Sequence, residues 1–265
     1  MHFKIAVVAF LLVLVFTSSA FAQRETPSLE DFSGSSQTWT YIGAGSSVLL
    51  TAVLFHNDQQ IYNDLYRWKM NNKILEDVSP VITNAGGGAF SIGLFGGFAG
   101  YGLIFKDKKA IEAGKIGLES FLLTGVTVQL FKHLCGRERP SAATRPGGFW
   151  HGPFARFHDP EDGKGISSFD AFPSGHTTTV FAAATTISDF YTEPWVSYLC
   201  YSLASFVAVS RVMEQTHWLS DCFIGALIGH YGTRLVERLN YRSSGITLLP
   251  QADEHQYGLL LSVTF

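Results

Sequence analysis

The chain has 265 residues, of which 46% are hydrophobic and only 15% are charged, and its formal net charge at pH 7 is −3. This length and composition allow one domain with a substantial apolar core, and they exclude a chain that is disordered throughout. The slight negative charge argues against a nucleic-acid-binding protein, which usually carries a marked basic excess. Three cysteines are too few for a disulfide-rich scaffold.

The N-terminus has the pattern of a secretory signal peptide. Lys4 precedes an unbroken apolar run over residues 5–16, and Ala20 and Ala22 follow at the positions that a signal peptidase reads. We therefore expect residues 1–22 to be a cleaved signal peptide, with an uncleaved N-terminal anchor as the alternative. The rest of the chain is then exported, and periplasmic in a bacterium. Residues 23–40 are polar, which indicates a linker or an N-terminal arm.

Between residues 41 and 241 the apolar periodicity is helical, so we predict a mainly α fold, a helical bundle of about six core helices. The helices are expected at residues 41–55, 56–80, 81–105, 116–131, 177–190, 195–209 and 222–236. Within residues 56–80, Ile61, Leu65, Trp68 and Ile74 are spaced to form one apolar face of an amphipathic helix.

Residues 81–105 contain no charged side chain and eight glycines. The stretch fits a membrane span, and it fits a tightly packed interior helix equally well. The mean hydropathy of the chain is +0.16, and without the first 22 residues it falls to about zero, which favours a soluble or surface-bound protein over one with many spans. Topologies with no spans and with five spans stay open, and both place the later motifs outside the cytoplasm.

Two segments break the helical pattern. Residues 140–173 are rich in proline, glycine and aromatic side chains, and a loop of this length within a compact domain is usually functional. From Tyr257 to Phe265, apolar residues stand at every second position, which is the spacing of a strand. We expect residues 246–249 to pair with it, so that residues 242–265 form a small β-hairpin appendage.

Charged and nucleophilic residues gather in three short clusters: residues 132–140, residues 173–176, and Ser210-Arg211 with His217 and Asp221 downstream. The cations of these clusters, Lys132, Arg139 and Arg211, lie at the ends of apolar helices. Isolated cations there are costly unless they are paired, and together they suit an anion with several oxygen atoms. The planar fork of an arginine side chain matches phosphate.

The other residues of the clusters complete an anion site with a nucleophile. Ser174 and Gly175 lie where a loop enters a helix, and helix N-termini bind anions. His217 and Asp221 are four residues apart, so on a helix they share a face, and Asp221 can accept a hydrogen bond that fixes the tautomer of His217. His217 is then the candidate nucleophile, and His176 is the candidate general acid and base.

The ordered motifs Lys-x6-Arg-Pro, Pro-Ser-Gly-His and Ser-Arg-x5-His-x3-Asp resemble the signature of the type 2 phosphatidic acid phosphatase superfamily. That superfamily includes lipid phosphatases, non-specific acid phosphatases and vanadium haloperoxidases. The resemblance implies a helical phosphatase domain over residues 41–241 that hydrolyses a phosphomonoester or a pyrophosphate. The reaction would pass through a phosphohistidine, with no metal or other cofactor and with vanadate as an inhibitor.

The resemblance also assigns the residues. His217 attacks phosphorus, His176 protonates the leaving oxygen and Asp221 orients His217. The phosphate oxygens are held by Lys132, Arg139, Ser174, Gly175 and Arg211. A phosphorylated lipid is the preferred substrate because residues 149–157 are aromatic-rich and residues 81–105 are uncharged, and contact with a membrane surface is expected.

Three alternatives remain open: a non-specific acid phosphatase on soluble esters, a vanadium-dependent haloperoxidase, and a protein that only binds phosphate. Arg137 lies off the motif spacing, and we interpret it as a solvated or substrate-steering charge. Cys135 lies near the expected site and could pair with either of the other two cysteines. We favour Cys200 and Cys222 as buried thiols, since both lie on apolar helices.

Overall fold

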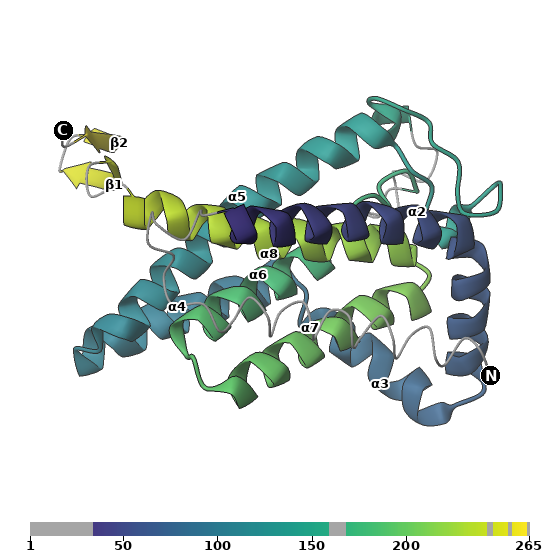
Figure 1. Cartoon of the computed structure of the whole chain (residues 1–265), viewed down its shortest axis with the longest axis horizontal. Coiled ribbons are helices and arrows are strands. Elements are labelled where there is room, and N and C mark those ends of the chain that lie inside the picture. Colours follow the sequence, from purple (N-terminus) through teal and green to yellow (C-terminus); the bar gives the residue numbers. More distant parts are fainter. Residues whose placement is uncertain (1–33, 159–167, 243–245, 254–255, 264–265) are drawn as a thin grey trace.

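A computed structural model describes residues 34–158, 168–242, 246–253 and 256–263, and it confirms the mainly α fold (Figure 1). The helices are α2 (Gly34–Met70), α3 (Lys73–Asn84), α4 (Gly88–Phe105), α5 (Lys108–Cys135), α6 (Gly175–Phe190), α7 (Pro194–Met213) and α8 (Leu219–Arg242). Two 3-10 turns, Pro140–Ala142 and Ala155–His158, lie in the predicted long loop between α5 and α6. The expected signal peptide lies outside the described residues.

The core forms where α2, α6, α7 and α8 pack together. Close contact between α6 and α8 depends on small residues. A Cβ at Gly225 would lie 2.6 Å from the carbonyl oxygen of Ser174, and a Cβ at Gly229 would lie 2.3 Å from that of Thr178. Because these glycines let the two helices touch, the start of α6 is held directly against the start of α8.

The uncharged stretch 81–105 is divided between two helices, since α3 continues to Asn84 and α4 begins at Gly88. Among the described helices, α4 and α7 are long and apolar enough to cross a membrane by length and composition. In α4 only 17% of the apolar window is buried within the fold, whereas in α7 the buried share is 67%. α4 therefore exposes most of its apolar surface, while α7 also serves the core.

The N-terminal helices differ from the expected segments. α2 begins at Gly34, inside the stretch that we interpreted as a linker, and it continues unbroken to Met70. Asn72 then caps α3 by accepting hydrogen bonds from two backbone N–H groups. Ile61 and Leu65 are buried as predicted, but Trp68 and Ile74 are 41% and 73% exposed. The turn before α3 redirects the chain, so residues on its two sides do not share one helix face.

The C-terminal hairpin is present, and its first strand is longer than the sequence indicated. β1 (Ile246–Asp253) and β2 (Gln256–Val263) are antiparallel, with Ile246 opposite Val263. Pro250, which we placed in the connecting turn, lies within β1 opposite Leu259. A two-stranded sheet has only edge strands, and an edge strand tolerates a proline.

Candidate active site

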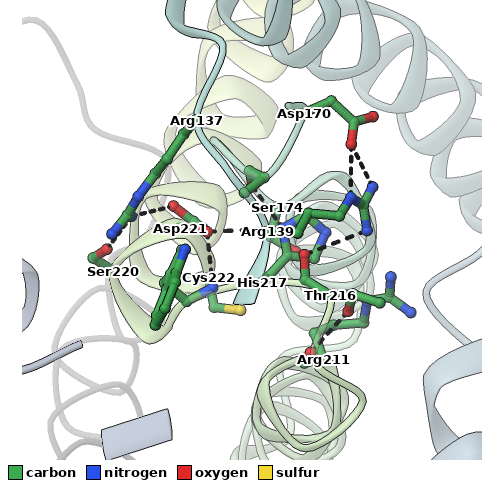
Figure 2. Close-up of polar contacts among 12 residues, drawn as sticks. Arg137, Arg139, Asp170, Ser174, Arg211, Thr216, His217, Ser220, Asp221 and Cys222 are labelled. Atoms are coloured by element: carbon green, nitrogen blue, oxygen red, sulfur yellow. Dashed lines mark hydrogen bonds and ion pairs between the residues drawn. The ribbon is translucent and has the colours of Figure 1, made fainter. Parts of the chain in front are cut away.

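Four helix ends meet at the site and bring the predicted motifs together (Figure 2). Lys132 lies in the last turn of α5 and Arg211 in the last turn of α7, while Asp221 lies in the first turn of α8. The N–H of Ser174 donates to the carbonyl oxygen of Asp221 at 3.0 Å, which joins the start of α6 to the start of α8.

Two of the predicted phosphate-binding cations share a carboxylate that the sequence analysis did not identify. Arg139 contacts Oδ1 of Asp170 through Nε at 2.8 Å and through a terminal nitrogen at 2.6 Å. Lys132 Nζ donates to the carbonyl oxygen of Asp170 at 2.5 Å and lies 3.4 Å from its Oδ2. Burial lowers the pKa of Lys132 to about 8, against the raising effect of Asp170. The three side chains are all buried.

The third cation keeps hydrogen-bonding capacity. Arg211 donates from one terminal nitrogen to the hydroxyl of Thr83 at 3.0 Å, so the end of α3 also reaches the site. Its Nε is buried and has no hydrogen-bond partner among the described residues. A buried guanidinium with an unused donor is suited to an anion at this position.

The start of α6 has the features of an anion-binding helix terminus. Ser174 is the N-cap and accepts from the N–H and the hydroxyl of Thr177. A Cβ at Gly175 would lie 3.6 Å from a methyl group of Val128, an ordinary contact. The packing therefore does not require glycine at this position. A glycine there leaves the backbone open to close approach by an anion.

His217 is held in the form that a nucleophile needs. Its Nδ1 donates to the carbonyl oxygen of Ala171 at 2.6 Å, which leaves the lone pair on Nε2. Burial, followed by the positive charges of Arg139 and Lys132, holds the pKa of His217 well below its usual range. The ring is therefore neutral at pH 7.

The relation between Asp221 and His217 differs from the expected one. α8 begins at Leu219, so His217 precedes the helix and does not share a helical face with Asp221. Oδ2 of Asp221 lies 4.0 Å from Nδ1 of His217 and accepts from the N–H of Trp218 at 2.8 Å. Asp221, the third residue of α8, thus closes the N-terminus of the helix as the acidic residue of a capping box does. The tautomer of His217 is fixed by the Ala171 carbonyl instead.

Arg137 is not the solvated or substrate-steering charge that we expected. Its side chain is 1% exposed, and a terminal nitrogen contacts Oδ1 of Asp221 at 2.5 Å. Burial raises the pKa of Asp221 to about 7, and the charge of Arg137 opposes that rise. The expectation for Arg137 was wrong because the motif spacing gives no information about a cation that forms an ion pair with another motif residue.

His176 lies among the cations, and the turn between α3 and α4 packs against it. A Cβ at Gly86 would lie only 2.7 Å from Cβ of His176, so this turn must be small. Burial is the main cause that lowers the pKa of His176 to about 4, and the charges of Arg211, Lys132 and Arg139 add to it. The same cations act on both histidines, as a shared phosphate site requires.

The loop after α5 is fixed by a second acidic residue. Burial opposes the ionisation of Glu138, but hydrogen bonds from the N–H groups of Thr144 and Phe149 lower its pKa to about 2. His151 contacts the same carboxylate at 2.9 Å. The cysteines are all free thiols, and of the two favoured as buried only Cys222 is fully so.

Two buried acidic residues that the sequence analysis did not identify, Asp58 and Asp170, nevertheless had a signal in the sequence. Asp58 stands between Leu54, Ile61 and Leu65 on the apolar face of α2, where a carboxylate needs a partner. Asp170 stands four residues before the N-cap Ser174, next to the second motif. The carbonyl of Ala171 has no such signal, because a backbone group is the same in every residue.

Comparison with known proteins supports the resemblance. Residues 115–243, just under half of the chain, match the model of the PAP2 superfamily. The resemblance inferred from the three motifs is thereby confirmed. The phosphatase motifs all lie within the matched residues, whereas α2, α3 and α4 lie outside them.

Proteins similar to this chain include enzymes named for lipid substrates. It is 44% identical over 62 residues to a lipid A 1-phosphatase of Porphyromonas gingivalis, covering 23% of this chain and 14% of that protein. It is 30% identical over 141 residues to a lipid A 1-phosphatase of Rhizobium johnstonii, covering 51% and 53%. A probable diacylglycerol pyrophosphate phosphatase 1 of Schizosaccharomyces pombe is 29% identical over 163 residues, covering 54% and 56%. The chain thus spans little more than half the length of these relatives, or less.

Two solved structures match the chain in the comparison of structures. A transmembrane PAP2 type phosphatidylglycerolphosphate phosphatase from Bacillus subtilis has a TM-score of 0.49 and 17% identity, covering 91% of this chain and 98% of that one. LpxE of Aquifex aeolicus has a TM-score of 0.39 and 23% identity, covering 61% and 93%.

Proposed function

We propose that this protein is a lipid phosphatase that works through a phosphohistidine on His217 without a metal ion. The observation that carries the proposal is the state of His217. The ring is buried and neutral, its Nδ1 proton is given to the Ala171 carbonyl, and three cations act on it. A neutral imidazole with a fixed lone pair on Nε2 is a nucleophile ready for phosphorus.

The reaction follows from the positions of the residues. Lys132, Arg139 and Arg211 bind the phosphate oxygens, and Nε2 of His217 attacks phosphorus as the bond to the leaving oxygen breaks. The imidazole becomes positively charged, and the carboxylate of Asp221, 4.0 Å from Nδ1, stabilises that charge. Water then displaces the phosphate from His217 and regenerates the neutral ring.

His176 supplies the proton for the leaving oxygen. With a pKa of about 4, its ring is neutral at pH 7 in the free protein. A phosphate dianion bound to the three cations offsets their repulsion and raises the pKa of His176, so that the ring takes up a proton as substrate binds. The same ring, neutral again after proton transfer, activates the water.

The positive charge that a metal would supply is provided by side chains. Three cations and the N-terminus of α6 converge on one site, and Arg211 retains a donor without a partner among the described residues. These groups stabilise the charge of a phosphoryl transition state directly. Chelators should therefore leave the activity unchanged.

A lipid substrate is supported by the outer surface of the bundle. Large apolar side chains are exposed along several helices, and contiguous exposed apolar surface marks sites of contact with a membrane or a partner. On α4, Leu103, Ile104 and Phe105 are 69%, 75% and 65% exposed. On α5, Leu130 and Leu134 are 58% and 44% exposed, near the same end of the helix as the buried Lys132. Apolar surface thus extends to the end of α5 that carries Lys132, which suits a lipid whose head group must enter the site.

The charges indicate how the protein sits in a membrane. Lys106, Lys108 and Lys109 lie where α4 ends and α5 begins, and Lys132 lies at the other end of α5. α5 has 28 residues, which span about 42 Å. Basic residues favour the cytoplasmic side, so we infer that α4 inserts in the membrane and that the site faces the outside. This orientation agrees with the expected export.

The test is phosphate release by the purified full chain in detergent micelles. Lipid A, phosphatidate and diacylglycerol pyrophosphate are compared with a soluble aryl phosphate, each with EDTA and with orthovanadate. We expect EDTA-resistant, vanadate-inhibited release that is fastest with a lipid. Preference for the aryl phosphate would indicate a non-specific phosphatase, and halide oxidation with vanadate and peroxide would indicate a haloperoxidase.

Two variants of the nucleophile complete the test. His217→Ala and His217→Asn should lose all turnover while still binding inorganic phosphate, because the cations are untouched. Appreciable turnover by either variant would exclude the phosphohistidine. His133→Ala is the matched control, since His133 lies in the last turn of α5, its Nδ1 hydrogen-bonds with the carbonyl of Gln129 in its own helix, and its ring packs against Phe157.

A further inference from the structure

A buried chain of three charges lies behind the nucleophile. Arg137 contacts Asp221 Oδ1 at 2.5 Å and Asp58 Oδ2 at 2.7 Å, so one guanidinium bridges two carboxylates. The hydroxyl of Ser220 accepts from Arg137 at 2.7 Å and donates to Asp58. Exposure is 1% for Arg137 and 0% for both carboxylates (Figure 2 shows the Asp221 side).

The surroundings of Arg137 exclude contact with substrate. The guanidinium lies 5.0 Å from the ring centroids of Phe55 and Trp150 and 5.5 Å from that of Trp218. The carbonyl oxygen of Gly147 accepts from two of its nitrogens. A cation that is enclosed by aromatic rings and saturated with acceptors serves only the groups that touch it.

Asp58 comes from a part of the chain that the family model does not cover, since α2 precedes residues 115–243. It lies on the apolar face of that helix, where an unpaired carboxylate is strongly destabilising. Its Oδ1 accepts from the N–H of Ser220 at 3.0 Å, and Oδ2 takes the other two bonds. Asp58 therefore couples α2 to the first turn of α8 and to Arg137.

The charge balance gives Asp58 a role in the reaction. Arg137 alone would cancel the charge of Asp221, whereas two carboxylates on one guanidinium leave a net charge of −1 beside His217. We propose that Asp58 and Arg137 are positioning residues for the nucleophile, which fix Asp221 and preserve that negative charge as the imidazole becomes positive. This inference rests on the proposed function of His217.

Ground-state binding and reaction are predicted to respond differently. Phosphate is bound by Lys132, Arg139 and Arg211, none of which touches Asp58. Loss of the Asp58 charge should leave phosphate affinity nearly unchanged. It should weaken every species in which His217 is positively charged, including a covalent adduct of vanadate on the ring.

The experiment compares three variants of the full chain in micelles. Asp58→Asn removes the charge, and Asp58→Glu restores it. Ser220→Ala is the matched control, because it removes a hydroxyl that touches both Arg137 and Asp58 without changing any charge. For each protein, kcat and KM are measured on the best lipid substrate, and the affinities for orthovanadate and inorganic phosphate are measured by calorimetry.

Asp58→Asn should lower kcat and the vanadate affinity at least tenfold, by about 1.4 kcal/mol or more, with KM and phosphate affinity within about twofold. Asp58→Glu should recover most of the lost kcat, and Ser220→Ala should stay within about threefold of the unmodified protein. Equal losses in Asp58→Asn and Ser220→Ala would overturn the charge-based role. Parallel losses of vanadate and phosphate affinity would do the same.

Failure of this inference is distinguishable from failure of the proposed function. An active protein that His217→Ala inactivates, with kcat and vanadate affinity unchanged in Asp58→Asn, refutes only the role of Asp58. If Asp58→Asn does not fold, Ser220→Ala still decides, since a tenfold loss of kcat there contradicts the proposal. Turnover that survives His217→Ala removes the proposed function and this inference together.

Discussion

Replacement of Asp170 by asparagine tests how the positive charge of the proposed phosphate site is balanced. The carboxylate contacts Arg139 through two hydrogen bonds and lies 3.4 Å from Lys132 Nζ. With Arg211, three cations and one carboxylate give the site a net charge of +2. Asp170→Asn raises that charge to +3 and leaves two buried cations without their common partner.

The change in stability can be estimated from these contacts. Removing one partner of a buried ion pair destabilises a protein by about 3–5 kcal/mol. Asparagine keeps an oxygen that can accept from Arg139, so the lower end, about 3 kcal/mol, applies. In a chain of this size that corresponds to a fall in Tm of about 6–12 °C. Inorganic phosphate then replaces the missing anion, and its affinity should rise by about tenfold or more.

The assay is thermal unfolding in micelles over a series of phosphate concentrations. The variant should start with a lower Tm and gain more from phosphate than the unmodified protein, because a ligand stabilises the folded state according to its affinity. Asp64→Asn is the control, since Asp64 pairs at 3.6 Å with an arginine whose side chain is 71% exposed and should change stability by less than about 0.5 kcal/mol. An unchanged Tm and phosphate response in Asp170→Asn would refute this account of the site.

Three further predictions follow from the site and the packing. Asp221→Asn should reduce kcat by about a hundredfold or more, because the negative charge beside His217 is lost. The tautomer of His217 should persist, since the Ala171 carbonyl holds it. Steady-state kinetics on a lipid phosphate would measure the effect, and a near-normal rate would make Asp221 purely structural. Gly229→Ala should destabilise the protein by about 2–3 kcal/mol, since its Cβ would lie 2.3 Å from a carbonyl oxygen of α6. In Gly97→Ala the new Cβ meets nothing within 4 Å, so this change should stabilise α4 by about 1 kcal/mol. Thermal unfolding measures the stability of both variants. The pKa of His176 is lowered from 6.5 to about 4 on folding, so stability that is present above pH 6.5 should be lost as the pH falls towards 4. His176→Gln should show a smaller loss over that range in denaturant unfolding, and an identical slope would contradict the lowered pKa.

The sequence predicts the helices because each buries an apolar stripe that repeats with the helical period. It predicts helix ends less well. α2 runs from Gly34 through a polar stretch that looked like a linker, and the turn before α3 separates Ile74 from the face that Ile61 begins. The polarity of a local stretch predicts neither the start of α2 nor the turn before α3, because packing between distant segments of the chain determines where a helix continues.

The three motifs could be singled out in the sequence because their residue types match a phosphate ion. Their partners could not, since Asp58 reaches Arg137 across 79 positions and the carbonyl of Ala171 reaches His217 across 46. A pairing over such distances exists only after the helices have packed. Arg137 shows the consequence: although it is two positions from Arg139 in the sequence, it contacts Asp58 and Asp221 and lies among aromatic side chains.

The spacing between His217 and Asp221 brings the two side chains near each other in a geometry that differs from the predicted one. A separation of four suggests two side chains on one helical face, but His217 precedes α8. The spacing instead lets Asp221, as the third residue of α8, reach back to the N–H of Trp218 and close the helix terminus. One oxygen of Asp221 thereby stabilises the helix and the other binds Arg137, so the carboxylate faces His217 without donating or accepting a bond to it. A group held in this way needs no rearrangement when the imidazole becomes charged, which is the condition under which electrostatic stabilisation of a transition state is most effective.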